Sequence, residues 1–166
     1  RQAQMNLNQF TQKVQEALSD AQNVAIEHKH QQIDAEHLLM ALVNLPEGLL
    51  PRFLQKMEIP VASFVQGLEA TLQKLPQVSG PGVQPGSIYV TTRLNQVLVK
   101  AQEEAKRLKD EYVSAEHILL ALLDEGPKTP AGELFQRFGL TQDRFLKALT
   151  EIRGKQRITS ATPEGT

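Results

Sequence analysis

The chain has no cysteine, and no apolar run in it approaches the length of a membrane span. The missing thiols exclude disulfides, thiolate metal sites and cysteine nucleophiles together, and their absence fits an intracellular setting. The first residues, Arg1 to Asn6, lack the apolar stretch of a signal peptide. We therefore expect a soluble, cytoplasmic protein.

An excess of charge of one sign is also missing. The 18 lysines and arginines nearly balance the 19 aspartates and glutamates, which leaves a formal net charge of −1. Because the basic residues are scattered among the acidic ones, we expect neither nucleic acid nor a membrane as a partner. With 166 residues, 40% of them hydrophobic, the chain can bury one substantial core as a single domain.

Common catalytic motifs are missing as well. A P-loop needs the pattern GxxxxGK[ST], and neither this pattern nor GxSxG or HExxH occurs. The glycines Gly80, Gly82 and Gly86 are followed by no lysine and lie in a proline-rich stretch, so they predict a linker. We expect no catalytic residue, no metal and no cofactor in this chain.

Four histidines remain as candidates for chemistry, together with the adjacent carboxylates Glu103-Glu104 and Asp110-Glu111. A zinc site needs three or four ligands at set spacing, which these histidines do not have. We interpret the histidines as solvated or helix-capping residues. Neighbouring residues of a helix point apart, so we interpret Glu103-Glu104 and Asp110-Glu111 as solvated helix faces.

The chain does contain the same unit twice. When Thr11–Leu42 is laid over Thr91–Leu122 without a gap, 12 of 32 positions are identical. Chance would give about two. Beyond Leu122 the register slips by one residue, and Phe64 and Leu68 then correspond to Phe145 and Leu149. The duplication covers most of the chain.

Each repeat carries the pattern of four helices. Apolar residues at three- and four-residue intervals predict a helix from about Asn8 to His28 and a counterpart whose inner face runs from Leu94 to Leu108. Asp34 and Ser114 suit helix N-caps, and the apolar segments behind them predict short helices in the centre of the core. We expect an all-α fold, a single eight-helix domain of two four-helix pseudo-repeats. The remaining predicted helices are Leu49–Met57, one that opens at Pro60, Ala131–Phe138 and Gln142–Ile152.

The boundaries follow from composition. We expect one domain over residues 6–153, with repeat one at about 8–75, a linker at 76–91 and repeat two at about 92–153. Prolines and glycines fill the predicted linker, and within it Ser87-Ile88-Tyr89-Val90 is too short to found a sheet. The end, residues 154–166, has too few apolar residues to fold, and we interpret it as a flexible tether to something larger.

The dipeptide Glu-His, at Glu36-His37 and Glu116-His117, opens the second helix of each repeat. A carboxylate in a first turn gains about 0.3–1 kcal/mol from the helix dipole, which accounts for the glutamates without further function. A second hypothesis is that the two helix starts form related surface pockets, whose N–H groups suit an anion and whose carboxylate suits a guanidinium. For His37 and His117 we favour packing at the helix start over proton transfer, because no nucleophile is paired with either.

Three stretches carry a resemblance to a known family: Thr11–Gln22, the pair Ala35–Leu39 with Ala115–Leu119, and the junction Leu75–Gly80. Together they resemble the duplicated N-terminal domain of Clp-type AAA+ unfoldases, over nearly the whole chain. Among these unfoldases, the junction and the tail Arg153–Thr159 are most similar to those of the ClpB-type disaggregases.

The resemblance implies a substrate-capturing domain that is monomeric by itself and tethered to ATPase modules outside this chain. The full-length protein would bind ATP and Mg²⁺, form a homohexamer, and act on unfolded or aggregated polypeptides with the DnaK chaperone system. The residues that the resemblance associates with substrate are Thr11, Asp110 and Glu116, and Val97 and Leu98 lie where it places an apolar groove. Since periodicity also assigns Val97 and Leu98 to the core, that side of the helix would have to serve both purposes.

The ClpC branch of the same family supplies the alternative. There the positions of Glu36 and Glu116 hold phosphorylated arginine, with Thr11 and Thr91 nearby. An adaptor-docking or phosphoarginine-binding domain of a protease-partner unfoldase is therefore the second hypothesis. The residues before the two caps make the first helix start nearly neutral and the second acidic, so we expect a client at the second.

Overall fold

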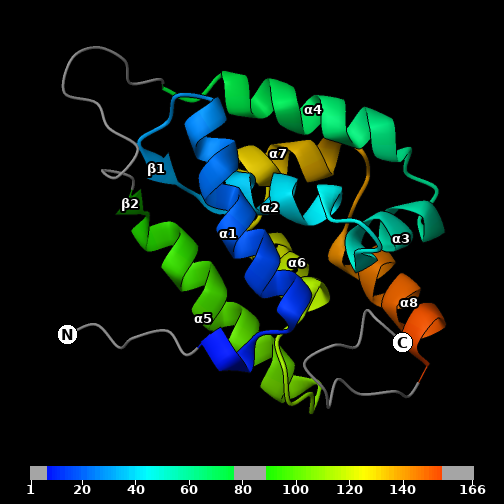
Figure 1. The fold of residues 1–166 in the computed structure, drawn as a ribbon. Helices are drawn as coiled ribbons and strands as arrows, with labels where there is room; N and C mark the ends of the chain where they lie inside the picture. The colour runs from blue at the N-terminus through cyan, green and yellow to red at the C-terminus, as the bar shows by residue number, and fades with distance from the viewer. Residues whose placement is uncertain (1–6, 77–88, 155–166) are drawn as a thin grey trace.

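The computed structural model describes residues 7–76 and 89–154, and eight α-helices lie in this part of the chain. This confirms the predicted all-α fold. Helix lengths match between the repeats: α1 pairs with α5, α2 with α6, α3 with α7 and α4 with α8 (Figure 1). The bounds are η1 (Leu7–Gln9), α1 (Gln12–Glu27), β1 (Gln32–Ile33), α2 (Ala35–Asn44), α3 (Leu49–Lys56), α4 (Val61–Gln73), β2 (Tyr89–Val90), α5 (Thr92–Arg107), α6 (Ala115–Asp124), α7 (Pro130–Arg137) and α8 (Gln142–Arg153).

Helix α1 begins at Gln12, four residues later than the predicted start at Asn8. Thr11 has extended backbone angles, and its hydroxyl accepts a hydrogen bond from the N–H of Val14, which makes it the N-cap. Phe10, counted in the predicted helix, instead forms a parallel β-bridge with Val113. Apolar periodicity could not separate this buried bridge residue from the helix behind it.

A short parallel ladder joins the repeats at two equivalent places. Gln32–Ile33 pairs with Tyr89–Val90, and Phe10 bridges Val113 in the same sense (Figure 1). The predicted linker, residues 76–91, is therefore too long at its end, since β2 and the N-cap of α5 lie within it. Residues 77–88 and 155–166, which contain the rest of that linker and nearly all of the predicted tether, lie outside the described residues.

Both first helices end in the same turn. Lys29 and Lys109 have left-handed φ values of 60° and 63°. In each case the next N–H bonds back to a carbonyl of the last helical turn, from His30 to Ala25 and from Asp110 to Ala105. This pattern closes a helix C-terminus, and here it directs the chain toward the cap of the next helix.

Helices α2 and α6 lie in the centre, as the sequence predicted, and all but one or two residues of each are buried. The aromatic contacts of the core cross from one repeat to the other. The ring of Phe53 meets that of Phe145 at 5.1 Å, and Phe64 packs against Phe135 and Phe138 at 6.3 and 5.5 Å. The two repeats share one core and form one domain. None of the helices in the two described segments is long and apolar enough to cross a membrane.

Candidate functional site

The two Glu-His helix starts are built alike. The ring nitrogen Nδ1 of His37 accepts the backbone N–H of Asp34 at 2.9 Å, and Nδ1 of His117 accepts that of Ser114 at 2.8 Å. Each histidine thus closes a capping box over the cap residue three positions earlier. The predicted role of His37 and His117 in helix-start packing is confirmed.

Asp34, Glu36, Thr91, Arg93 and Glu125 form the first helix-start cluster, which joins the repeats. The Arg93 guanidinium donates to Glu36 at 2.7 Å, to Asp34 at 3.3 Å and to Glu125 at 2.9 and 3.1 Å. Burial lowers the pKa of Arg93, but the bonds to Glu125 and Glu36 outweigh burial and raise it. This arginine is a permanent cation that bridges carboxylates of both repeats.

Glu36 is only 1% exposed, and its second oxygen accepts the backbone N–H of Ala131 at 2.9 Å. Ala131 lies in the first turn of α7, where free N–H groups favour a carboxylate. A single side chain therefore connects α2 with α5, through Arg93, and with the start of α7. Both oxygens of this buried carboxylate are therefore already hydrogen-bonded within the chain.

Thr11, Asp110, Ser114, Glu116 and Arg153 form the second helix-start cluster, which lies within the second repeat except for Thr11. The Arg153 guanidinium, at the end of α8, binds both Asp110 and Glu116. The Ser114 hydroxyl donates to Glu116, and the N–H of Thr11 donates to the carbonyl of Val113 at 2.9 Å. This cluster connects the start of α6 with the last turn of α8.

Asp110 completes the second cluster through His117. Nε2 of His117 lies 2.7 Å from a carboxylate oxygen of Asp110. Since Nδ1 of the same ring accepts the Ser114 N–H, its proton resides on Nε2, which donates to Asp110. In the first repeat His30 occupies the place of Asp110, and its Nδ1 lies 2.8 Å from Nε2 of His37.

The pKa values of the histidines of the first repeat shift in different directions. Burial and the nearby charge of His30 lower the pKa of His37 to about 4, and burial and His28 lower that of His30. His28 has two acceptors, the carbonyl of Val24 and the carboxylate of Glu69, each at 2.8 Å. Burial lowers the pKa of His28, but these two bonds and the charge of Glu69 raise it by more than burial lowers it. The net shift of this pKa is upward.

The structure brings three residues of the first predicted set together: Asp110 and Glu116 share Arg153, and Thr11 contacts the loop between them. Val97 and Leu98 are 2% and 4% exposed and belong to the core. Of the alternative set, Glu36 and Thr91 lie in the first cluster, where the hydroxyl of Thr91 donates to Asp34 at 3.0 Å. The two helix-start clusters are thus equivalent corners of one fold, and the alternative set takes residues from both.

Several interpretations of these residues are wrong. The helix starts are not surface pockets for a foreign guanidinium, because Glu36 and Glu116 are each 1% exposed and bind the chain's own arginines. The first start is not nearly neutral, since three carboxylates surround one arginine there. Sequence analysis missed Arg93 and Arg153, and the only signal for Arg93 was its place two residues after Thr91, a residue of the alternative set.

The paired carboxylates and one histidine also differ from expectation. Glu104 and Asp110 are buried and only their neighbours Glu103 and Glu111 face solvent, so one member of each pair is not on a solvated face. His30 is buried rather than solvated, and its side chain lies against His37. Across residues 7–76 and 89–154, no three histidine, aspartate or glutamate side chains gather so as to hold a metal ion.

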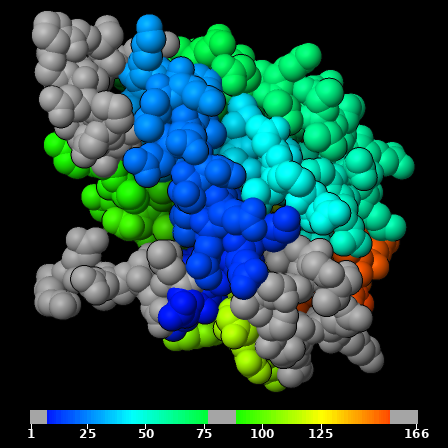
Figure 2. Space-filling view, viewed as in Figure 1, coloured from blue at the N-terminus to red at the C-terminus, as the bar shows by residue number. Residues whose placement is uncertain are grey.

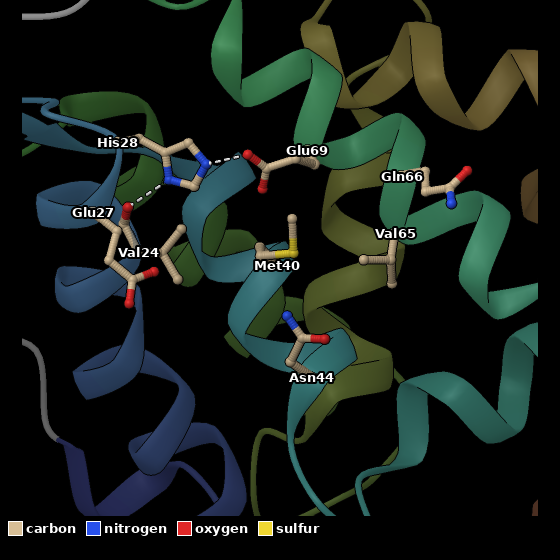
Figure 3. A pocket seen from close by; sticks show the side chains of 8 residues that line it. All are labelled: Val24, Glu27, His28, Met40, Asn44, Val65, Gln66 and Glu69. Carbon is tan, nitrogen blue, oxygen red and sulfur yellow. Dashed lines mark hydrogen bonds and ion pairs between the residues drawn. The ribbon is translucent and has the colours of Figure 1, made fainter.

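A groove of about 380 Å³ lies between α1, α2 and α4 in the first repeat. Figure 2 shows α1 across this face, with α2 and α4 beside it. Met40 forms the floor between Val24 and Val65 (Figure 3). His28 and Glu69 meet at one end of the groove, and Asn44 lies at the other (Figure 3). The lining also includes Glu27 and Gln66.

Comparison with known proteins identifies the family. Residues 9–138 match the model of the Clp repeat (R) N-terminal domain. Chaperone protein ClpB of Nitratidesulfovibrio vulgaris is 50% identical over 98% of this chain and 19% of its own length, and that of Bacillus cereus is 45% identical over 98% and 18%. The chain thus spans about a fifth of the length of these relatives.

Among solved structures, the N-terminal domain of Hsp104 from Candida albicans superposes with a TM-score of 0.77 at 27% identity, covering 92% of this chain and 97% of that one. The family model covers the first repeat and the second repeat through α7, and the ClpB relatives cover nearly the whole chain. The chain belongs to the Clp repeat N-terminal domain family, in the form found in ClpB chaperones.

Proposed function

We propose that this chain is the client-capturing domain of a ClpB-type disaggregase. It would bind exposed hydrophobic segments of unfolded or aggregated proteins and pass them to ATPase modules. The family and the chaperone names of its relatives support this proposal. In the full-length protein, a homohexamer, ATP with Mg²⁺ and cooperation with the DnaK system belong to the same proposal.

One contrast carries the proposal. The glutamates at both helix starts, Glu36 and Glu116, are buried and bonded within the chain, whereas the α1/α2/α4 groove is open and has an apolar floor. A site of the first kind holds the fold together, and a site of the second kind can accept an apolar side chain from another molecule. The geometry therefore favours hydrophobic capture over the reading of charge.

The binding should be weak. A groove that buries about 500 Å² of apolar area gains on the order of 12 kcal/mol, and association costs roughly 4–15 kcal/mol. The net binding free energy of one domain acting alone is therefore small. A ring that presents several copies would compensate through effective concentration.

In this proposal a client reaches Asp110 and Glu116 only when Arg153 leaves them. It reaches Thr11, Val97 and Leu98, which are buried, only when the helices around them move. Their first task is to hold α5, α6 and α8 together.

The test is a titration of ¹⁵N-labelled domain with a permanently unfolded client, a reduced and carboxymethylated protein. We expect chemical-shift changes that saturate at high micromolar to millimolar client and a matched folded protein that causes none. The proposal fails if the unfolded client causes no change at millimolar concentration.

The alternative, a phosphoarginine- or adaptor-binding domain, requires an incoming guanidinium to displace Arg93 or Arg153. Free phosphoarginine added to the same labelled sample tests it. Changes centred on Glu36 or Glu116, stronger in an Arg153→Ala variant, would support the alternative. If phosphoarginine moves neither residue in either protein, the alternative is excluded.

A further inference from the structure

The groove between α1, α2 and α4 has an acidic rim. Glu27 and Glu69 line it, and Glu27 is exposed. Its one basic lining residue, His28, is already bonded to Glu69. Along α1, Glu16 and Asp20 are exposed and lie eight and four residues before Val24. Residues at this spacing share one side of a helix, so both acidic side chains lie on the same side of α1 as Val24.

The second repeat has the opposite character at the corresponding positions of α5. Gln96, Lys100 and Arg107 stand where the first repeat has Glu16, Asp20 and Glu27. The place of Val24 is taken by Glu104, which is buried and bound by Arg107 and Lys100. The duplication therefore kept the helices and changed the chemistry of this surface.

The floor of the groove suits side chains of varied shape. Met40, at its centre, has a flexible and polarizable thioether that adapts to different apolar partners. Its counterpart in the second repeat is Leu120, a fully buried core residue. Val24 and Val65 are partly exposed on either side of Met40 (Figure 3).

From these observations we propose that the groove binds client segments in which an apolar side chain is flanked by lysine or arginine. The apolar side chain packs on Met40 between Val24 and Val65, and the cation lies against Glu27 and the acidic side of α1. This inference rests on the proposed function and adds to it a place and a preferred client chemistry. Segments flanked by acidic residues are rejected, because like charges face each other at the rim.

Three fluorescein-labelled ten-residue peptides test the preference by fluorescence anisotropy. The first has a leucine pair flanked by arginines, the second the same pair flanked by glutamates, and the third two alanines flanked by arginines. We expect the first peptide to bind about tenfold more tightly than either other peptide at low salt, and this advantage over the glutamate peptide to shrink as salt screens the rim.

Two variants locate the site. Val65→Arg fills the groove with a cation, and Glu27→Lys reverses the rim at an exposed position without touching the core. Both variants should bind the first peptide about tenfold more weakly than the unaltered domain does. The matched controls Val99→Arg and Glu103→Lys change exposed residues of α5 in the same way and should bind as the unaltered domain does. Thermal unfolding verifies that each variant is folded.

The outcomes separate the inference from the proposed function. If the unaltered domain binds unfolded client and both groove variants bind it equally well, the inference is wrong and the proposed function stands. If the unaltered domain binds neither client nor peptide, the proposed function itself fails. Two other outcomes would overturn the inference. If the domain dimerises in sedimentation and Val65→Arg abolishes the dimer, the groove binds a second copy. If peptide binding strengthens when residues 155–166 are removed, the groove binds the chain's own end.

Discussion

At the scale of single residues, two arginines decide what the helix starts can do. Arg93 and Arg153 neutralise glutamates that are each 1% exposed, at equivalent positions of the two repeats. The carboxylates are equivalent but the arginines are not, since one comes from the start of α5 and the other from the end of α8. The same buried glutamate has been stabilised in two ways.

We predict that Arg93→Met destabilises the domain by about 3 kcal/mol, because it leaves Glu36 buried beside only one remaining donor. Chemical denaturation with urea would measure the loss. The double variant Arg93→Met/Glu36→Gln should recover much of it, because glutamine is neutral and can still accept the Ala131 N–H. Equal losses in the single and double variants would contradict this account.

We also predict that the first repeat makes stability depend on pH. The folded pKa of His37, about 4, lies below the ordinary value of 6.5, so the unfolded chain binds more protons between these values. The stabilisation is complete above pH 6.5 and is lost as pH falls toward 4, on the order of 3 kcal/mol in all. The lowered pKa of His30 acts in the same direction and the raised pKa of His28 in the opposite one.

A comparison of unfolding free energies at pH 7 and 4.5 with those of His37→Asn isolates this contribution, since the carboxylates are common to both proteins. Between pH 7 and 4.5 the His37→Asn variant should lose less unfolding free energy than the unaltered domain. An equal loss in both proteins would show that His37 is not the group responsible.

At the scale of elements, the short turn before α7 brings the backbone of Gly126 close to that of Gly132. A Cβ at Gly132 would lie 2.1 Å from the carbonyl oxygen of Gly126. We predict that Gly132→Ala costs more than about 2 kcal/mol, because a backbone atom must move. Gly67→Ala in α4 is the control, since the three atoms nearest to its Cβ all belong to side chains, the closest being the end of Leu134 at 2.7 Å. Thermal unfolding should show a smaller loss of stability for Gly67→Ala than for Gly132→Ala.

Helices could be predicted from sequence far better than the site. The periodicity and caps of each repeat gave all eight helices, with boundaries off by up to four residues, because those signals are local. The burial of Glu104 and Asp110 and the partners of Glu36 depend on residues distant in the chain. Arg93 lies 57 positions from Glu36, and nothing in a single sequence indicates that the two meet.

The groove escaped sequence analysis for the same reason. Val24 and Val65 fit the periodic inner faces of their helices, and Met40 lies in a segment that is apolar all round. Only the packing of α1 against α2 and α4 shows that the three side chains border an opening.

At the scale of the whole molecule, the repeats cannot be separated without loss. The aromatic contacts of the core, both β-bridges and the Arg93–Glu36 pair all cross between them. We predict that a fragment of residues 1–76 does not fold cooperatively by itself. Circular dichroism and NMR dispersion should show this, and mixing with residues 77–166 should restore folded signals. A sharp unfolding transition in the isolated fragment would contradict the prediction.

The reciprocal bridges, Ile33 with Val90 and Phe10 with Val113, have a further consequence. Each repeat gives the other the same contact that it receives, which is the pattern of a two-fold symmetric dimer. The arginines have since broken that symmetry. Two copies of the first repeat would bring Lys13, which stands at the position of Arg93, to each buried Glu36 in place of the arginine fork. Two copies of the second repeat would offer both Arg93 and Arg153 to each Glu116. What resembles a fused homodimer has become a pair of unlike halves.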